Sequence, residues 1–365
     1  MKVLLYLNTL SRFNYGNLMS NLELMKGFLE KGVEVLFAVN RKTPDDVEVP
    51  VEVLPLNARG DLDRPLKLRE VVERVSPDAV VANMLTQITT ASFAKKLLGS
   101  TGTKFIGIER DTRPWHRRIW KIPYRVFMKR VYEGMDQIVA VSPAVERDLR
   151  KTFFLSRNRI RVIYNPVDID RIRSMATESV EREMEKIFGE REVLVCVGRL
   201  DRQKEPLLAL EVFRRVKERN GNVCLCFVGS GELEGPLRER IRSYGFEREV
   251  VITGFRENPY PYMKRAKLLL HTASREGLGR VILEGMSLGL PVVAFYNEES
   301  GYREVVEEAG CGLLVPFGDI EGMAEGIAKL LRDGEFYRDL SDRALKASER
   351  FRRDRIVEEL MSLLC

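Results

Sequence analysis

The 365-residue sequence contains only two histidines, two tryptophans and five cysteines. The cysteines form no C-x-x-C pair, and three of them lie in apolar runs typical of strands, which favours buried, reduced thiols over disulfides or a metal site. Neither the phosphate-loop pattern G-x-x-x-x-G-K nor the zinc-protease pattern H-E-x-x-H occurs. Phosphate-loop and zinc-protease chemistry are therefore excluded, and the reduced thiols favour a cytoplasmic protein.

Long hydrophobic runs are also missing. No apolar run reaches the length of about 20 residues that a membrane-spanning helix needs. The N-terminal MKVLLYLNTL turns polar without a small-residue cleavage site, so we expect a first strand and not a signal peptide. Any contact with a membrane should then be peripheral, on its cytoplasmic face.

The bulk composition is that of a mildly basic globular protein. Apolar residues make up 44%, charged residues 31%, and the formal net charge is +6. This balance fits a protein that meets phosphates or an anionic membrane surface, and equally a protein with a well-solvated exterior. The length favours two domains.

Apolar strand patterns alternate with helical patterns along the chain, which predicts parallel sheets covered on both faces. We expect strands at 3–8, 33–39, 78–83, 103–109 and 136–142, and a second series at 193–198, 223–229, 249–255, 267–272 and 291–295. The fold class is thus α/β, with two doubly wound Rossmann-like domains at 1–166 and 167–340. A charged amphipathic helix should follow at about 341–365.

The stretch SREGLGRVILEGMSL places two acids, Glu276 and Glu284, eight positions apart. Gly277 and Gly279 allow a tight turn and a close approach of a ligand, before a helix whose N-terminus offers free N–H groups. Glu276 should lie in the loop and Glu284 in the helix, roughly 8–10 Å away. That separation fits a sugar ring, a diphosphate and a ribose in a row. The alternative is an ordinary helix cap with an exposed helical glutamate.

In a second loop, VGRLDRQKEP at 197–206, Arg199 and Lys204 lie just before the start of a helix. Two cations beside a helix N-terminus suit a diphosphate, although a charged loop without function has the same composition. Gly254 and Phe255 follow a further strand and could meet a base. The segment VGSGELEG matches a dinucleotide fingerprint weakly, because its third glycine comes one position late.

Metal ligation has little support. The D-x-D triads at 61–63 and 168–170 are interpreted as structural, and so is His271 at a strand exit. His116, in a basic loop, is instead a candidate for contact with an acceptor.

Residues 110–130, RDTRPWHRRIWKIPYRVFMKR, carry eight Arg or Lys against one Asp and include both tryptophans. A basic, aromatic-rich helix of this kind is typical of a membrane-surface element. The same pattern also fits a solvated helix face over a core stripe.

Several of these segments resemble the retaining glycosyltransferases of family 4, which have the GT-B fold. The resemblance is carried by GRLDRQK, by GFRENPYPYMKRAKLLLHTASREGLGRVILEGMSLGLPVVA with its E-x7-E acid pair, and by ESGYREVV and GCGLLVPFGD. In the N-terminal half, IGIERDTRPW and RVIYNPVDI also look like family segments. The family implies two domains facing across a cleft, with the C-terminal helix packing back toward the N-terminal domain.

The resemblance also implies roles for individual residues. Glu276 would contact the donor sugar and Glu284 the ribose, while Arg199 and Lys204 hold the diphosphate. Further donor contacts would come from Gly16, Gly254, Phe255, Gly277, Leu278, Gly279 and Arg280. The acceptor candidates are Glu109, Arg110 and His116. Two positions depart from the family: the loop 10–21 has the single glycine Gly16 where a pair is usual, and Arg280 replaces a small or amide residue.

The implied reaction moves a hexose or hexosamine from a nucleotide sugar to a lipid-linked or glycan acceptor. UDP-sugar is the expected donor, with GDP-sugar as the alternative, and no metal or other cofactor is required. Nucleic acid is not an expected partner, and the sequence does not indicate an oligomeric state. A nucleotide-sugar epimerase and a basic nucleic-acid-binding module are the competing interpretations.

Overall fold

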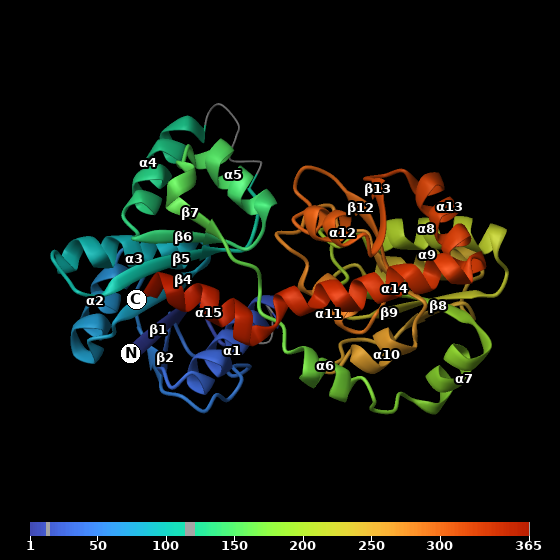
Figure 1. Ribbon diagram of the computed structural model, residues 1–365, viewed down its shortest axis with the longest axis horizontal. Helices are drawn as coiled ribbons and strands as arrows, with labels where there is room; N and C mark the ends of the chain where they lie inside the picture. The colour runs from blue at the N-terminus through green and yellow to red at the C-terminus, as the bar shows by residue number, and fades with distance from the viewer. Residues whose placement is uncertain (12–14, 114–120, 365) are drawn as a thin grey trace. The chain divides into compact units, whose positions relative to one another are not determined.

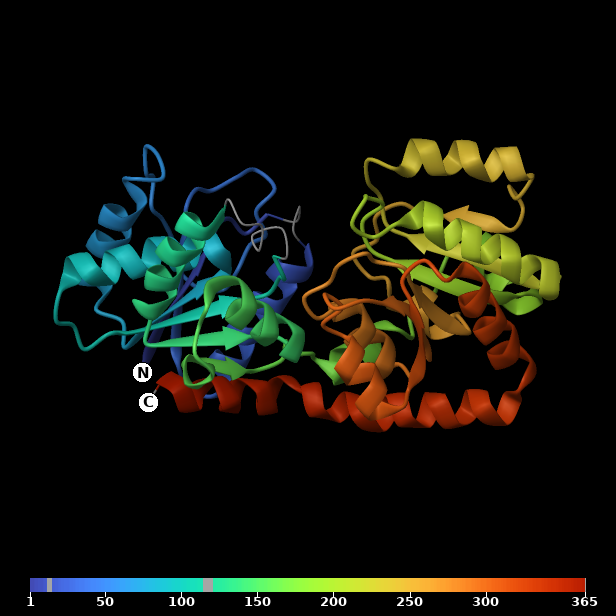
Figure 2. The same cartoon turned by 90° about the horizontal axis from the view of Figure 1, so that it is seen from above.

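The computed structural model describes residues 1–11, 15–113 and 121–364. The chain divides into two compact units. The first comprises Met1–Val167 together with Phe351–Cys365, and the second comprises Asp168–Arg350. Each unit is built around its own parallel sheet, with helices on both sides of the sheet (Figures 1 and 2).

The first unit contains a seven-stranded sheet in the order β3-β2-β1-β4-β5-β6-β7. Its strands are β1 (Lys2–Leu7), β2 (Glu34–Val39), β3 (Val53–Pro55), β4 (Ala79–Asn83), β5 (Lys104–Glu109), β6 (Gln137–Ala140) and β7 (Ile160–Val162). Its helices are α1 (Tyr15–Glu30), α2 (Arg64–Val75), α3 (Met84–Leu98), α4 (Ile122–Glu133), α5 (Pro143–Phe153), the 3₁₀ turn η4 (Arg157–Arg159) and α15 (Arg353–Leu364). The central strands are buried along almost their full length, because helices cover both faces.

The second unit contains a six-stranded sheet in the order β10-β9-β8-β11-β12-β13. Its strands are β8 (Glu192–Val197), β9 (Val223–Val228), β10 (Val250–Ile252), β11 (Leu268–His271), β12 (Val292–Tyr296) and β13 (Gly312–Pro316). Its helices are α6 (Ile169–Met175), α7 (Arg182–Glu190), α8 (Pro206–Arg219), α9 (Glu234–Tyr244), α10 (Tyr260–Arg265), α11 (Arg280–Ser287), α12 (Arg303–Ala309), α13 (Ile320–Arg332) and α14 (Gly334–Ser348).

The strand order reverses once in each sheet, and this reversal positions the candidate site. In the second unit β8 pairs with β9 on one side and with β11 on the other, both in parallel. The loops that leave the carboxyl ends of β8 and β11 therefore run to opposite sides of the sheet. The gap between two such loops is where open α/β sheets bind ligands.

The C-terminal segment forms two helices with a break, and not the single helix expected over 341–365. α14 belongs to the second unit, the 3₁₀ turn η5 (Glu349–Phe351) interrupts the helix, and α15 belongs to the first unit. α15 lies alongside α1, where Arg353 pairs with the buried Glu23 at 2.7 Å (Figure 1). The C-terminal helix thus packs on the N-terminal domain, as the resemblance implied.

The expected helix over 110–130 is also shorter than its pattern suggested. Residues 110–113 are not helical, and α4 begins at Ile122. Pro123 lies in the first turn of α4, a position that tolerates its missing N–H. The three short strands β3, β7 and β13 had no counterpart in the sequence prediction, because runs of three to five residues with few consecutive branched side chains give little periodic signal.

Candidate functional site

The loop between β8 and α8 brings the first cation of the site into place. Asp201 accepts hydrogen bonds from the backbone N–H groups of Gln203 and Lys204 at 3.1 and 3.0 Å, which closes a turn. Glu205 then adopts a left-handed conformation and precedes Pro206, the first residue of α8. The turn directs Lys204 back over Gly198 at the end of β8, so its position is fixed by local structure.

Side-chain hydrogen bonds join this loop to the loop that follows β11. The Thr272 hydroxyl donates to the carbonyl oxygens of Lys204 and Glu205, at 3.0 and 3.2 Å. The backbone N–H of Ser274 donates to the Gln203 carbonyl at 2.9 Å, and the Gln203 amide donates to Arg275. Segments 72 residues apart in sequence are thus held side by side.

The result is a direct ion pair between Lys204 and Glu276, with both side chains about one-fifth exposed. Burial is the largest single influence and raises the pKa of Glu276, but the charge and hydrogen bond of Lys204, together with smaller contributions from His271 and Arg199, outweigh it, so the pKa lies below its ordinary value. Glu276 is held from its other side by the loop after β12, because the Gly301 N–H donates to its carbonyl at 2.8 Å. The carboxylate is therefore ionised and fixed in place.

His271 lies behind this pair, at the end of β11. Burial, together with the charge of Lys204, lowers the pKa of His271 to about 3 and keeps the imidazole neutral. Its ring meets that of Tyr302 edge-on at 5.0 Å, and its Nε2 has no hydrogen-bond partner among the described residues. The aromatic contact fits the structural role expected of His271, while the unpartnered nitrogen adjoins the candidate site.

Arg199 and Glu284 are two further charged candidates in this unit. Arg199 pairs with Asp201 at 3.1 Å and is about half exposed. Glu284 is buried in α11, where its Oε1 accepts from Arg280 Nε at 2.7 Å and from the Tyr260 hydroxyl at 3.3 Å. Tyr260 begins α10, so the N-P-Y-P-Y segment supplies a direct partner of the second acid.

The N-terminus of α11 separates the two acids. Gly279 precedes the helix in a left-handed conformation, φ 78°, that favours glycine. Gly277, Leu278 and Arg280 are buried around it, so the helix start is rigid. This arrangement places a helix N-terminus between one carboxylate in a loop and another in the helix.

The remaining glycines of the second unit have mostly packing roles. A Cβ at Gly229 would lie 1.9 Å from the Gly198 carbonyl oxygen, and one at Gly231 would lie 2.4 Å from that of Leu200. The weak fingerprint at 228–235 is therefore explained by close packing of the β8 and β9 loops. Gly254 forms a bridge with Gly229, and the ring of Phe255 is half exposed beside it.

The acceptor candidate Glu109 is fully buried at the end of β5 in the first unit. It forms an ion pair with Arg113, whose backbone N–H donates to Asp148 at 2.7 Å. Burial raises the pKa of Glu109 to about 7, even though Arg113 opposes the change. Its Oε1 has no hydrogen-bond partner among the described residues. Glu109 therefore anchors the segment that follows it.

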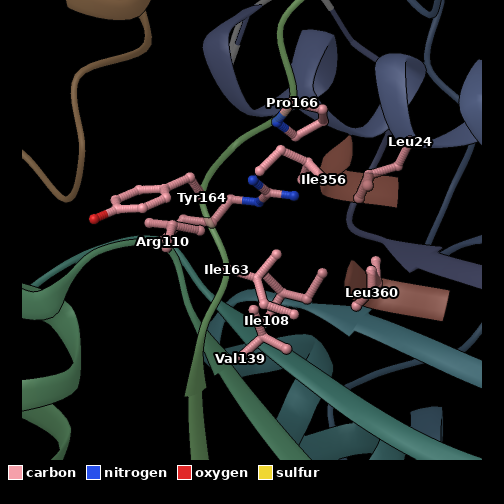
Figure 3. Close-up of a pocket in the computed structure, with 10 residues that line it drawn as sticks. Leu24, Ile108, Arg110, Val139, Ile163, Tyr164, Pro166, Ile356 and Leu360 are labelled. Carbon is pink, nitrogen blue, oxygen red and sulfur yellow. The ribbon is translucent and has the colours of Figure 1, made fainter. Parts of the chain in front are cut away.

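Arg110 lines a small pocket formed by β5, β6, the strand-exit segment 163–166 and α15. Figure 3 shows its side chain among Ile108, Ile163 and Ile356. Its guanidinium donates to Asn83 at 3.1 Å and to Asn165. The pocket volume of about 10 Å³ admits one water molecule and no sugar.

The remaining candidates, Gly16 and His116, belong to the first unit by their position in the chain. Gly16 lies exposed in the first turn of α1, in the first unit. His116 falls outside the described residues. Of the basic residues in 110–130, Arg113 and Arg125 are buried, and Arg125 donates to the carbonyl oxygens of Thr152 and Lys151. The basic segment is therefore partly structural.

The D-x-D acids have local structural partners. Asp61 pairs with Arg64 at 2.7 Å, Asp63 accepts from the Arg59 N–H, and Asp168 caps α6. Across the described ranges, no group of three or more His, Cys, Asp or Glu side chains is arranged to hold a metal ion. Within the same ranges, no helix has both the length and the apolar content to cross a bilayer.

Comparison with known families gives two matches, which together span most of the chain. Residues 178–347 match the family described as glycosyl transferases group 1. Residues 19–171 match the family described as glycosyltransferase family 4. The two matches correspond to the two structural units.

Individual relatives have low sequence identity to this chain but align with much of its length. An uncharacterised glycosyltransferase of Methanocaldococcus jannaschii is 25% identical over 77% of this chain and 68% of its own length. A Campylobacter jejuni enzyme named N-acetylgalactosamine-N,N'-diacetylbacillosaminyl-diphospho-undecaprenol 4-alpha-N-acetylgalactosaminyltransferase is 26% identical over 64% of this chain and 61% of its own length. The crystal structure of Anabaena HepE in complex with UDP has a TM-score of 0.82, covering 100% of this chain and 99% of HepE at 20% identity. The fold is therefore GT-B.

Proposed function

Because the chain is a glycosyltransferase of the family 4 type, we propose that it transfers a hexose or hexosamine, with retention, from a nucleotide sugar to a hydroxyl group. The acceptor is a lipid-linked or cell-surface glycan, a class supported by the name of the Campylobacter relative. UDP is the proposed nucleotide, supported by the UDP complex of HepE, and GDP is the alternative. The observation that carries the proposal is the meeting of Lys204 and Glu276 beside the N-terminus of α11.

Three groups are available to hold the diphosphate. Lys204 supplies a point charge, Arg199 supplies a planar fork that is exposed enough to turn toward a ligand, and α11 supplies the positive end of its helix dipole. Together they can stabilise the charge that develops on the leaving nucleoside diphosphate. This arrangement supports a transfer that needs no metal ion.

The two acids lie on either side of that phosphate region. We assign Glu276 to hydroxyl groups of the donor sugar and Glu284 to the ribose, since a carboxylate accepts hydrogen bonds from paired hydroxyls. Arg280 and Tyr260 hold Glu284 in one orientation. Gly254 and Phe255 are assigned to the base, and the backbone from Gly277 to Arg280 to the phosphates.

The proposed step has the acceptor attacking the same face of the sugar from which the diphosphate departs. The acceptor oxygen bonds to the anomeric carbon as the bond from that carbon to the phosphate oxygen breaks. The proton of the acceptor hydroxyl passes to an oxygen of the β-phosphate. No side chain of the protein acts as nucleophile.

The acceptor side is assigned to the first unit. Glu109 is buried, so we assign it a positioning role through Arg113 at the start of the segment that carries His116. Arg110 is held by Asn83 and Asn165, and it remains a candidate for direct contact.

The first unit also carries a surface suited to a membrane. Five exposed apolar side chains lie on two adjacent helices, and we call them the α3–α4 apolar face: Phe93, Leu97, Ile122, Val126 and Phe127. The rings of Phe93 and Phe127 stack at 6.1 Å, which joins the two helices. Lys96, Lys121, Lys129 and Arg130 lie on the same helices or at their start. We propose that this face docks on anionic lipid and gives access to a lipid-linked acceptor.

The transfer reaction is tested with a panel of nucleotide sugars and lipid-extract acceptors, followed by mass spectrometry of the products. Release of nucleoside diphosphate should require an acceptor, whereas an epimerase would convert the donor without one.

Arg199→Ala and Lys204→Ala should each lower turnover by about 100-fold or more, because each removes stabilisation of the leaving group. Arg202→Ala, on the exposed side of the same loop, is the matched control. Near-normal turnover in both site variants would refute the assignment.

A further inference from the structure

The proposed function gives Lys204 two anionic partners, which compete for its positive charge. Its ammonium group is paired with Glu276, and the proposed function requires the same group for the diphosphate. When Lys204 turns to a phosphate oxygen, its pairing with Glu276 weakens. What then satisfies the Glu276 carboxylate determines which ligands the site accepts.

Among the described groups that act on the charge of Glu276, neither His271 nor Arg199 replaces Lys204. His271 is neutral because burial and the charge of Lys204 lower its pKa to about 3. Arg199 is paired with Asp201 and is itself assigned to the diphosphate. The ring of Tyr302 lies near Glu276 around Gly279, but its hydroxyl group donates to the Phe295 carbonyl.

The backbone around Glu276 is also committed. Its own N–H donates to the Glu299 carbonyl at 3.3 Å, and its carbonyl accepts from Gly301. The loop therefore has little freedom to carry the carboxylate out to water. Leaving a partly buried carboxylate without a partner has an energetic cost.

A nucleotide sugar can remove that cost, and a nucleoside diphosphate cannot. The hydroxyl groups of the sugar donate to the carboxylate at the position that Lys204 leaves. A nucleoside diphosphate takes Lys204 and returns nothing to Glu276. We infer that Glu276 is a specificity-determining residue, which favours the nucleotide sugar over the nucleoside diphosphate product by exchanging Lys204 for sugar hydroxyls. The inference rests on the proposed function.

The same exchange drives product release. Once the sugar has moved to the acceptor, Glu276 has lost its hydroxyl partners and competes with the diphosphate for Lys204. The competition weakens the hold on the product. The ion pair between Lys204 and Glu276, which joins two loops, thus becomes part of the reaction cycle.

The test is a calorimetric titration of the full chain with UDP and with UDP-glucose, without acceptor. Glu276→Gln should bind UDP about three- to tenfold more tightly than the wild type, because the neutral amide competes poorly for Lys204. The same variant should bind UDP-glucose no more tightly, so the preference for the sugar nucleotide falls. Glu239→Gln, on the exposed face of α9, is the control and should match the wild type.

A second background separates this exchange from simple repulsion between Glu276 and phosphate. In Lys204→Met, repulsion is retained but the competition is gone, so adding Glu276→Gln should increase UDP affinity by clearly less than in the wild type. Equal gains in both backgrounds would overturn the inference, as would an unchanged or weakened UDP affinity in Glu276→Gln. Glu276→Ala takes its place if melting curves show that Glu276→Gln is unfolded. Failure of the wild type to bind UDP, GDP or ADP would instead refute the proposed function.

Discussion

The carboxyl group of Glu109 gives a pH dependence that belongs to a single residue. Its pKa rises from 4.5 to about 7 because burial outweighs the attraction of Arg113. Asp111, Asp148 and Tyr132 also act on it, and none of them supplies a positive charge. Between pH 4.5 and about pH 7, the Glu109 carboxyl group binds a proton in the native state that it has lost in the unfolded state. The free energy of unfolding must therefore fall as pH rises across that window.

Glu109→Gln should remove this dependence, since the amide does not titrate. Relative to the wild type, the variant should gain about 3 kcal/mol in unfolding free energy between pH 5 and pH 8. Urea unfolding followed by tryptophan fluorescence measures it, because Trp115 and Trp120 both belong to the first unit. Glu133→Gln, exposed on α4, controls for a general loss of charge. Parallel pH profiles for Glu109→Gln and the wild type would contradict the expectation.

At the scale of elements, the exits of β8 and β9 are packed backbone against backbone. Gly229 has φ 154°, and a Cβ there would lie 1.9 Å from the carbonyl oxygen of Gly198. Because that contact is with backbone and not with a flexible side chain, the β8 exit itself would have to move. The loop that carries Arg199 and Lys204 begins at this point.

Gly229→Ala should therefore destabilise the second unit by about 1–3 kcal/mol and also weaken UDP binding. Gly235→Ala is the matched change six residues later, where a Cβ would meet nothing within 4 Å. In α9 this alanine should be neutral or stabilising by up to about 1 kcal/mol. Thermal unfolding with and without UDP measures both effects. Equal melting temperatures for the two variants would show that the packing of the exits is unimportant.

At the scale of the whole molecule, the α3–α4 apolar face is expected to determine where the enzyme works. The double variant Val126→Glu/Phe127→Glu should lower binding to phosphatidylglycerol vesicles by about tenfold, since it replaces exposed apolar surface with like charge. Binding to phosphatidylcholine vesicles should be weak for every form. Leu62→Glu changes an exposed leucine outside this face and is the control. Sedimentation that is unchanged in the double variant would argue against docking through this face.

Several features of this protein were predictable from local sequence. The runs V-L-V-C-V and V-C-L-C-F predict buried parallel strands, because only β-branched and apolar side chains tolerate helices on both faces. Glu276 in a loop and Glu284 in the following helix were predictable from two glycines and a resumed helical pattern. The structure of the basic segment 110–130 was harder to predict, since charge alone does not reveal that the side chains of Arg113 and Arg125 are buried.

The sequence by itself determined the α/β class, the principal strands and the two acid positions, because these depend on short-range periodicity and turn chemistry. Only the tertiary structure decided that Lys204 pairs with Glu276, that Tyr260 reaches Glu284, and that Glu109 is buried with Arg113. The first two contacts join residues from different βα units, and strand order, which no local pattern encodes, brings such units together. Burial of Glu109 depends on how the chain packs around the end of β5, which no local pattern encodes.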